Sequence, residues 1–149
     1  MHIAELTDDY LGYTGRYVRI LENTLTEAPA ICKWQGYYYL IGSGCTGWAP
    51  NTARLFRAKN IFGPWEFVGN PCRGVNPFNK LGPEKTWGAQ STFILPIHNR
   101  PGQFIAMFDI WTPKNPIDAR YVWLPVSFEK DSLTIHWKDQ WKLDPPISR

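Results

Sequence analysis

Residues 26–43 constrain the fold most, because they predict a β-hairpin with one carboxylate at its open end. Pro29 is incompatible with a helix interior, so the first half of the segment is expected to be extended. Gly36 supplies the permissive backbone of a turn, and the aromatic and β-branched residues 37–41 are typical of a second strand. Glu27 stands just before the first strand, so its carboxyl is expected to point into the space that the strand ends surround.

A second segment repeats this pattern further along the chain. Residues 90–97 are strand-like, residues 99–102 are turn-like, and residues 103–109 are again strand-like. Aligning the two hairpins places Glu27 over Gln90, and their separation of 63 residues suits one four-stranded sheet with its loops. Antiparallel sheets repeated around an axis form a β-propeller whose innermost strands line a channel. The repeat therefore predicts an all-β partial propeller in which Glu27 and Gln90 both face the channel.

The rest of the chain fits two to three four-stranded antiparallel blades of one domain. Further strands are expected at residues 1–6, 17–21, 52–58, 66–68, 118–126 and 133–137. Residues 71–88 form a long irregular insertion rich in Gly and Pro. A loop of this length without secondary structure is usually functional or mobile.

The composition excludes several classes of function. The net charge of +3 is small and scattered, which argues against a nucleic-acid surface. No apolar run approaches the roughly 20 residues of a membrane span. Residues 1–10 are polar and acidic and do not form a secretion signal, so the protein is expected either to be cytoplasmic or to begin downstream of its natural start.

The three cysteines and the three histidines give no sign of a metal centre. Cys32, Cys45 and Cys72 lack CxxC spacing and paired histidines, so zinc is not expected. A disulfide between Cys32 and Cys45 across the hairpin is compatible with the sequence, and buried free thiols are the alternative. We expect no cofactor, although the sequence leaves open a channel metal such as calcium.

The remaining polar groups point to carbohydrate chemistry. There is no phosphate-binding loop, no nucleophile elbow and no HExxH motif, whereas aromatic residues make up 15% of the chain and can both fill a core and stack on sugar rings. A carboxyl partly enclosed by apolar residues has a raised pKa and can donate a proton to a glycosidic oxygen. Glu27, beside Ala28 and Pro29, fits this role. Gln90 is the candidate for positioning water in an inverting hydrolysis, although an amide is a poor base.

Six other side chains are candidates for contact with an oligo- or polysaccharide. They are Trp48, Asn51, Glu84, Asp109, Trp111 and Arg120. Trp48 and Asn51 lie in a Gly-rich loop, which is either a substrate loop or a simple blade connection. Asp109 and Trp111 lie in the matching loop of the second hairpin, where Asp109 can also cap or bridge the backbone.

Several ordered motifs resemble glycoside hydrolase family 43, in the branch of the exo-β-1,3-galactanases and their relatives. The motifs are Glu27-Ala28-Pro29-Ala30, Tyr37-Tyr38 with Leu40-Ile41-Gly42-Ser43, Thr46-Gly47-Trp48-Ala49-Pro50-Asn51, Gly63-Pro64-Trp65, Gln90-Ser91-Thr92-Phe93 and Arg120-Tyr121-Val122-Trp123-Leu124-Pro125. Together they span almost the whole chain. The resemblance implies a five-bladed propeller and hydrolysis of a β-galactoside such as β-1,3-galactan with inversion of configuration.

The same resemblance implies roles for two residues, and it implies that part of the family domain is absent from this sequence. Glu27 would be the general acid, and Gln90 would take the place of the usual base. A full family domain is longer, and residues 1–149 resemble only its C-terminal part. A half ring leaves unpaired edges, so we expect either a fragment or a chain completed by another copy or by a partner. The alternative function is a non-catalytic carbohydrate-binding or structural remnant of a propeller.

Overall fold

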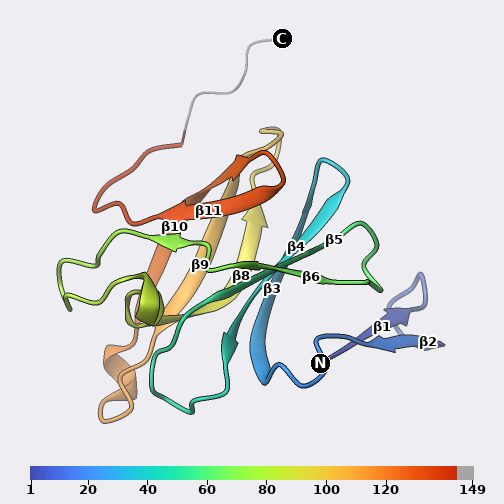
Figure 1. The fold of residues 1–149 in the computed structure, drawn as a ribbon, viewed down its shortest axis with the longest axis horizontal. Coiled ribbons are helices and arrows are strands. Elements are labelled where there is room, and N and C mark those ends of the chain that lie inside the picture. Colours follow the sequence, from blue (N-terminus) through green and yellow to red (C-terminus); the bar gives the residue numbers. More distant parts are fainter. Residues whose placement is uncertain (144–149) are drawn as a thin grey trace.

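The computed structural model describes residues 1–143, in which eleven strands form three sheets (Figure 1). The first sheet is a hairpin of β1 (His2–Leu6) and β2 (Tyr13–Arg19). The second has the order β3 (Thr26–Trp34), β4 (Tyr37–Gly44), β5 (Arg54–Ala58) and β6 (Glu66–Gly69). The third has the order β7 (Cys72–Arg73), β11 (Ser132–His136), β10 (Arg120–Glu129), β9 (Phe104–Ile110) and β8 (Ala89–Pro96).

The predicted all-β class and partial propeller are confirmed. The second sheet is a four-stranded antiparallel meander, as expected for one blade. Gln35 and Gly36 form its first turn with φ values of 46° and 82°, and two positive φ values in a two-residue loop match the twist of the flanking strands. The hairpin of β1 and β2 projects from the side of the other two sheets (Figure 1). Its second strand begins earlier than the predicted residues 17–21.

The long insertion is not structureless, which corrects the prediction. It begins with β7, which pairs in parallel with β11 and adds a fifth strand to the third sheet. It ends with η1 (Pro83–Gly88), a 3₁₀ segment that carries the fully buried Trp87. The indole N–H of Trp87 donates to the carbonyl of Gly74 at 3.1 Å. A second 3₁₀ turn, η2 (Pro116–Asp118), connects β9 to β10.

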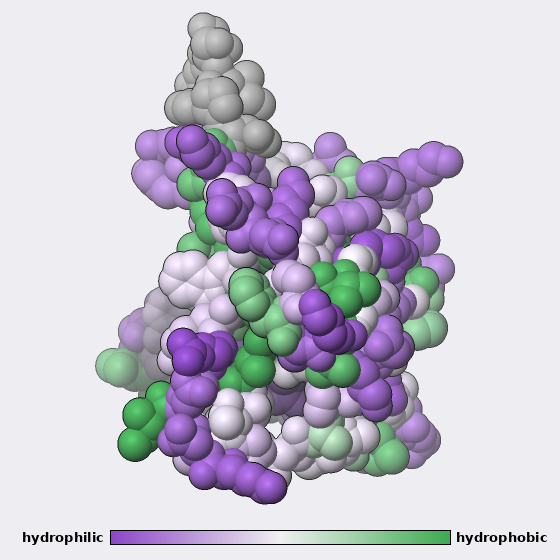
Figure 2. Space-filling model, turned by 90° about the vertical axis from the view of Figure 1, so that its left-hand side faces the viewer, coloured by the Kyte–Doolittle hydropathy of each residue, from purple (hydrophilic) through white to green (hydrophobic). Residues whose placement is uncertain are grey.

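The main core lies where the second and third sheets face each other. It contains Ala30 and Ile41 from the second sheet and Ile94, Phe108 and Leu124 from the third, all almost completely buried. On the face of the molecule shown in Figure 2, hydrophobic residues lie only in small separate groups among hydrophilic ones. No helix within residues 1–143 is long and apolar enough to cross a membrane.

The outer face of the third sheet is apolar as well. Phe93, Leu95, Tyr121 and Trp123 are 38–71% exposed. Phe93 on β8 and Trp123 on β10 both lie opposite Met107 on β9, so these side chains share one face of the sheet. An antiparallel sheet with one solvated face usually has polar residues there. Apolar residues on both faces are typical of a sheet that lies between two other layers, as a propeller blade does.

The three cysteines are free, so the structure contains no bridge between Cys32 and Cys45. Cys32 lies opposite Tyr39 on the β3–β4 ladder, whereas Cys45 follows the far end of β4 and is exposed. Burial raises the pKa of the Cys32 and Cys72 thiols to about 12. The predicted buried thiols are therefore found at two of the three positions.

We expect iodoacetamide to label Cys45 alone in the folded protein and all three cysteines in the unfolded chain. The thiolate is the nucleophile, and a buried thiol with a pKa of about 12 is almost entirely protonated at about pH 8. Mass spectrometry of the digested protein measures the labelling at each site. In the control variant Cys45→Ser the folded protein should take up no label. Labelling of Cys32 or Cys72 as fast as Cys45 would contradict the packing of the core.

Candidate active site

Glu27 and Gln90 are brought together at the junction of two sheets. Glu27 is the second residue of β3 and Gln90 the second residue of β8, and these two strands pack against each other (Figure 1). The Nε2 group of Gln90 donates to Oε1 of Glu27 at 3.0 Å and to Oγ of Ser43 at 2.8 Å. The two residues that the sequence repeat singled out therefore share one site, and both are half-buried.

A second hydrogen bond joins the next pair of equivalent positions. The hydroxyl of Ser91 donates to the carbonyl of Ala28 at 2.8 Å, and this pair is separated by 63 residues, as are Glu27 and Gln90. Ala28 has a φ of 52° and lies in a β-bulge between Glu27 and Ala30. The bulge turns this backbone away from the regular ladder and toward β8. The beginnings of β3 and β8 are thus joined by two direct hydrogen bonds.

An open hollow lies over the pair. It has a volume of about 320 Å³ and is lined by Glu27, Ala28, Gly47, Trp48 and Gln90. This volume is near the lower end of the range for small-molecule sites in proteins, roughly 300–1,000 Å³. A smaller cavity of about 20 Å³ adjoins it, and Trp48 and Gln90 line both spaces. The site therefore offers room for one small polar ring beside a carboxyl and an amide.

Trp48 and Trp111 form an aromatic wall beside these spaces. Their ring centroids are 4.8 Å apart, with the ring planes tilted by 57°. Trp48 is 65% exposed and Trp111 is 45% exposed, so both rings keep a face open to solvent. The two loops that the sequence analysis matched to each other thus meet at the site, one from each sheet.

Asn51 braces the loop that carries Trp48. Its Oδ1 accepts from the backbone N–H of Gly44 at 2.7 Å, and its Nδ2 donates to the carbonyl of Gly44 at 2.8 Å and to the hydroxyl of Thr46 at 2.7 Å. The Asn51 amide is therefore occupied by the loop in this geometry, although the residue also lines the smaller cavity. Its predicted contact with a sugar remains a prediction.

Three other predicted site residues lie outside the lining of the hollow. Asp109 is directly opposite Gln90 on the β8–β9 ladder and half-buried, so its side chain leaves the same face of the sheet. Glu84 is exposed on η1, where its carboxylate accepts from the backbone N–H of Gly82 at 3.2 Å. Arg120 pairs with Asp118 at the surface. None of Asp109, Glu84 and Arg120 lines the hollow or the smaller cavity beside it.

Ser43 and Gly47 are site residues that the sequence analysis did not single out. Ser43 is 5% exposed and accepts from the Gln90 amide. Gly47 lines the hollow beside Trp48 with a φ of 61°. Among residues 1–143, no group of three or more His, Cys, Asp or Glu side chains is arranged to hold a metal ion.

The contact between Glu27 and Gln90 limits what the site can do in this geometry. In inverting glycosidases the two carboxyl groups are roughly 6.5–9.5 Å apart, which leaves room for a water molecule. Here the amide nitrogen and the carboxyl oxygen are 3.0 Å apart. A sugar and its attacking water can therefore fit between the two groups only if one of them turns away.

Comparison with known proteins identifies relatives among solved structures. No protein-family model and no curated protein matches the sequence. A GH43 β-1,3-galactosidase solved with galactodeoxynojirimycin is 48% identical, with a TM-score of 0.87 over 95% of this chain and 39% of that chain. A second GH43 β-1,3-galactosidase is 35% identical, with a TM-score of 0.86 over 95% of this chain and 29% of that chain.

An exo-β-1,3-galactanase from Clostridium thermocellum is more distant. It is 33% identical, with a TM-score of 0.75 over 90% of this chain and 28% of that chain. The chain thus spans well under half the length of each of these relatives. Over nearly its whole length, the chain is similar to part of glycoside hydrolase family 43, in the branch of the β-1,3-galactosidases and exo-β-1,3-galactanases.

Proposed function

We propose that the Glu27 site belongs to a glycoside hydrolase that cleaves β-galactosides such as β-1,3-galactan with inversion of configuration. The observation that carries the proposal is the direct hydrogen bond between Glu27 and Gln90 beneath a hollow with an aromatic wall. The substrate class is supported by the relatives, which are named β-1,3-galactosidases and exo-β-1,3-galactanases.

Glu27 is the general acid in this proposal. Its carboxyl is half-buried at the edge of the hollow. Because Oε1 accepts from Gln90, we assign the transferable proton to Oε2. That proton passes to the glycosidic oxygen as the bond to the anomeric carbon breaks, which leaves Glu27 as a carboxylate.

Gln90 positions the attacking water on the other side of the sugar. The oxygen of this water bonds to the anomeric carbon as the bond to the leaving oxygen breaks. Because an amide is too weak a base to take the proton that the water loses, this proton passes to the solvent in the open hollow. This role of Gln90 requires the Glu27–Gln90 hydrogen bond to open when the substrate enters. A hydrogen bond between neutral groups contributes about 0.5–1.5 kcal/mol, so the binding of the sugar must offset a cost of this order. Trp48 and Trp111 supply part of it by stacking on the apolar C–H face of the sugar. Asp109, beside Gln90, binds a hydroxyl group.

We propose that hydrolysis requires a complete propeller channel, to which this chain contributes only one part. The chain spans 39% of the length of the β-1,3-galactosidase to which it is 48% identical. Its third sheet has an apolar outer face with Phe93 and Trp123 about half exposed. We therefore propose that further blades, or a second copy of the chain, cover this face and supply the remaining wall around the sugar.

Proton NMR of a reaction between β-1,3-galactobiose and the protein with its channel completed, by further blades or by a second copy, tests the proposal. Inversion at a β-linkage releases galactose first as the α-anomer, before mutarotation mixes the two forms. An α-linked digalactoside is the matched control and should remain intact. First release of the β-anomer would refute inversion, and binding without any cleavage would refute hydrolysis.

The second candidate function is sugar binding without hydrolysis. It is favoured by the 3.0 Å contact itself, because Gln90 fills the space that an attacking water needs. This alternative expects that Glu27→Gln leaves binding unchanged, whereas Trp48→Ala or Trp111→Ala abolishes it. Calorimetric titration with galactose and β-1,3-galactobiose measures binding. Release of galactose by the wild type and its loss in Glu27→Gln would decide for hydrolysis and against this alternative.

A further inference from the structure

We infer that Ser43 is a positioning residue that fixes the orientation of the Gln90 amide for attack by water. The inference rests on the proposed function and extends it, since it gives a role to a side chain that neither the repeat nor the motifs assigned. It starts from one contact: Oγ of Ser43 lies 2.8 Å from Nε2 of Gln90.

The two hydrogen bonds of the Gln90 amide determine which end faces the hollow. An amide NH₂ group carries two hydrogens, and in Gln90 they are directed to Glu27 and to Ser43. In the proposed acid form the Glu27 proton is on Oε2, so Oε1 can only accept, and the end of Gln90 that faces Oε1 must be the NH₂ group. The carbonyl oxygen Oε1 is then the end that is left to accept a hydrogen bond from water.

Ser43 is the anchor that persists during the proposed reaction. Glu27 must turn toward the glycosidic oxygen to donate its proton, and its bond to Gln90 is then lost. The hydroxyl of Ser43 takes no part in the proton transfer, so it can hold Nε2 throughout. Without this hydrogen bond, the terminal torsion of Gln90 has only a weak preference between two orientations about 180° apart. The amide can then turn its NH₂ group toward the water.

The backbone around Ser43 is held tightly enough for this role. Ser43 is 5% exposed and lies opposite Glu27 on the β3–β4 ladder. A Cβ at Gly42 would lie 2.6 Å from Cγ2 of Thr26 and 3.0 Å from the carbonyl oxygen of Glu27. A Cβ at Gly44 would lie 3.0 Å from the guanidinium of Arg54. The close packing on both sides of Ser43 leaves β4 little freedom to shift.

The kinetic test compares Ser43→Ala with Ser43→Thr. Loss of one hydrogen bond that orients Gln90 should lower kcat about tenfold and leave KM within about twofold. Ser43→Thr keeps a hydroxyl at a strand position that tolerates β-branched residues, so it should restore most of kcat. Adding Ser43→Ala to Gln90→Ala should cause no further fall in kcat. A further tenfold fall in that double variant would overturn the inference, because Ser43 would then act without Gln90.

A second readout does not depend on catalysis. The side-chain amide signals of Gln90 in ¹⁵N-labelled protein are identified by their absence from the Gln90→Ala variant. Ser43→Ala should shift one of the two amide protons upfield and increase its exchange with water. Unchanged Gln90 signals would overturn this inference alone. A wild-type protein that cleaves no β-galactoside while Ser43→Ala still shifts these signals would overturn the proposed function but not the contact.

Discussion

Replacing Glu27 by glutamine is expected to lower kcat for β-1,3-galactobiose by about 100-fold to 10,000-fold, the usual contribution of a general acid. The new amide has nearly the same shape as the carboxyl, and its oxygen can still accept from Gln90, but it has no acidic proton for the leaving oxygen. Binding of the sugar should therefore be retained. Initial rates of galactose release and calorimetric titration measure the two effects separately.

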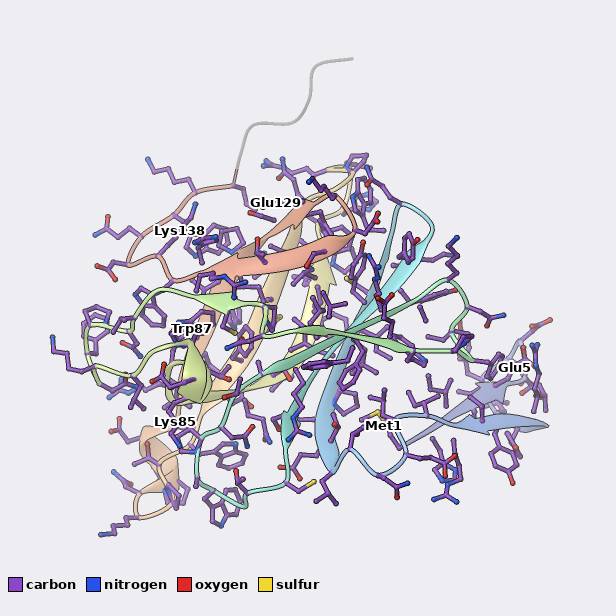
Figure 3. The ribbon with its side chains drawn as sticks, in the orientation of Figure 1. Met1, Glu5, Lys85, Trp87, Glu129 and Lys138 are labelled. Atoms are coloured by element: carbon purple, nitrogen blue, oxygen red, sulfur yellow. The ribbon has the colours of Figure 1, made fainter. Side chains whose placement is uncertain are left out.

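Two comparisons make this test specific for acid catalysis. A substrate with an activated aryl leaving group needs little protonation, so Glu27→Gln should reduce its hydrolysis far less than that of galactobiose. Glu129→Gln makes the same chemical change at an exposed position on β10, labelled in Figure 3, and should leave both rates unchanged. Equal losses on the two substrates would show that Glu27 is not the proton donor.

Trp87→Ala is expected to lower the free energy of unfolding by about 3–5 kcal/mol. Trp87, labelled in Figure 3, is 0% exposed. Its ring packs against Phe108 and Trp137 at centroid distances of 5.7 and 5.8 Å. The substitution leaves a large cavity and removes the N–H that satisfies the carbonyl of Gly74. The expected loss is a large part of the roughly 5–15 kcal/mol that stabilises a typical domain. Urea unfolding followed by circular dichroism measures it.

The same substitution should also loosen the insertion that precedes β8. The amides of Asn76 and Asn79 donate to the carbonyl of Trp87 at 3.3 and 2.7 Å and hold the insertion around it. Limited proteolysis should therefore cut residues 74–82 faster in the variant than in the wild type. Trp123→Ala is the control, because Trp123 is 52% exposed and should lose much less stability. Similar losses at the two positions would contradict the assignment of Trp87 to the core.

The strands could be predicted because turn signals are local, and the repeat predicted that Glu27 and Gln90 face one channel. Their direct hydrogen bond was not predicted. A two-residue turn at Gln35-Gly36, flanked by runs of β-branched and aromatic residues, defines the first hairpin without any knowledge of the fold. The separation of 63 residues between Glu27 and Gln90 then relates β3, the inner strand of one blade, to β8, the inner strand of the next. Equivalent positions in adjacent blades lie close to the same axis, which is why two distant residues could be placed in one site.

The structure of the insertion at residues 71–88 could not be predicted, because it depends on contacts with residues far away in the sequence. β7 has only two residues, and its parallel pairing with β11 joins Cys72 to Ile135. A pair of this length leaves no periodic pattern in the sequence. Thr86 and Trp87 have positive φ values of 47° and 59°, which nothing in their residue types suggests.

Ser43 was missed for a related reason. The turn at residues 35–36 alone would place Ser43 opposite Ala28, but the bulge at Ala28 shifts the register and places it opposite Glu27. An alanine with a φ of 52° has no sequence signature, and Ser91 holds its carbonyl from the next sheet. Asn51, Glu84 and Arg120 were predicted as sugar-binding residues from their residue types alone. In the structure their polar groups bind Gly44, Gly82 and Asp118 instead.

Glu27 and Gln90 lie on two different sheets, so the distance between the proposed proton donor and the proposed water-positioning amide depends on the tilt of one blade against the next. Repacking at Ile41 or Ile94, in the core between those blades, would change this tilt. Such a substitution would alter the chemistry from a distance, although it touches neither Glu27 nor Gln90. Core packing between the blades would thereby set the geometry of the proposed active site.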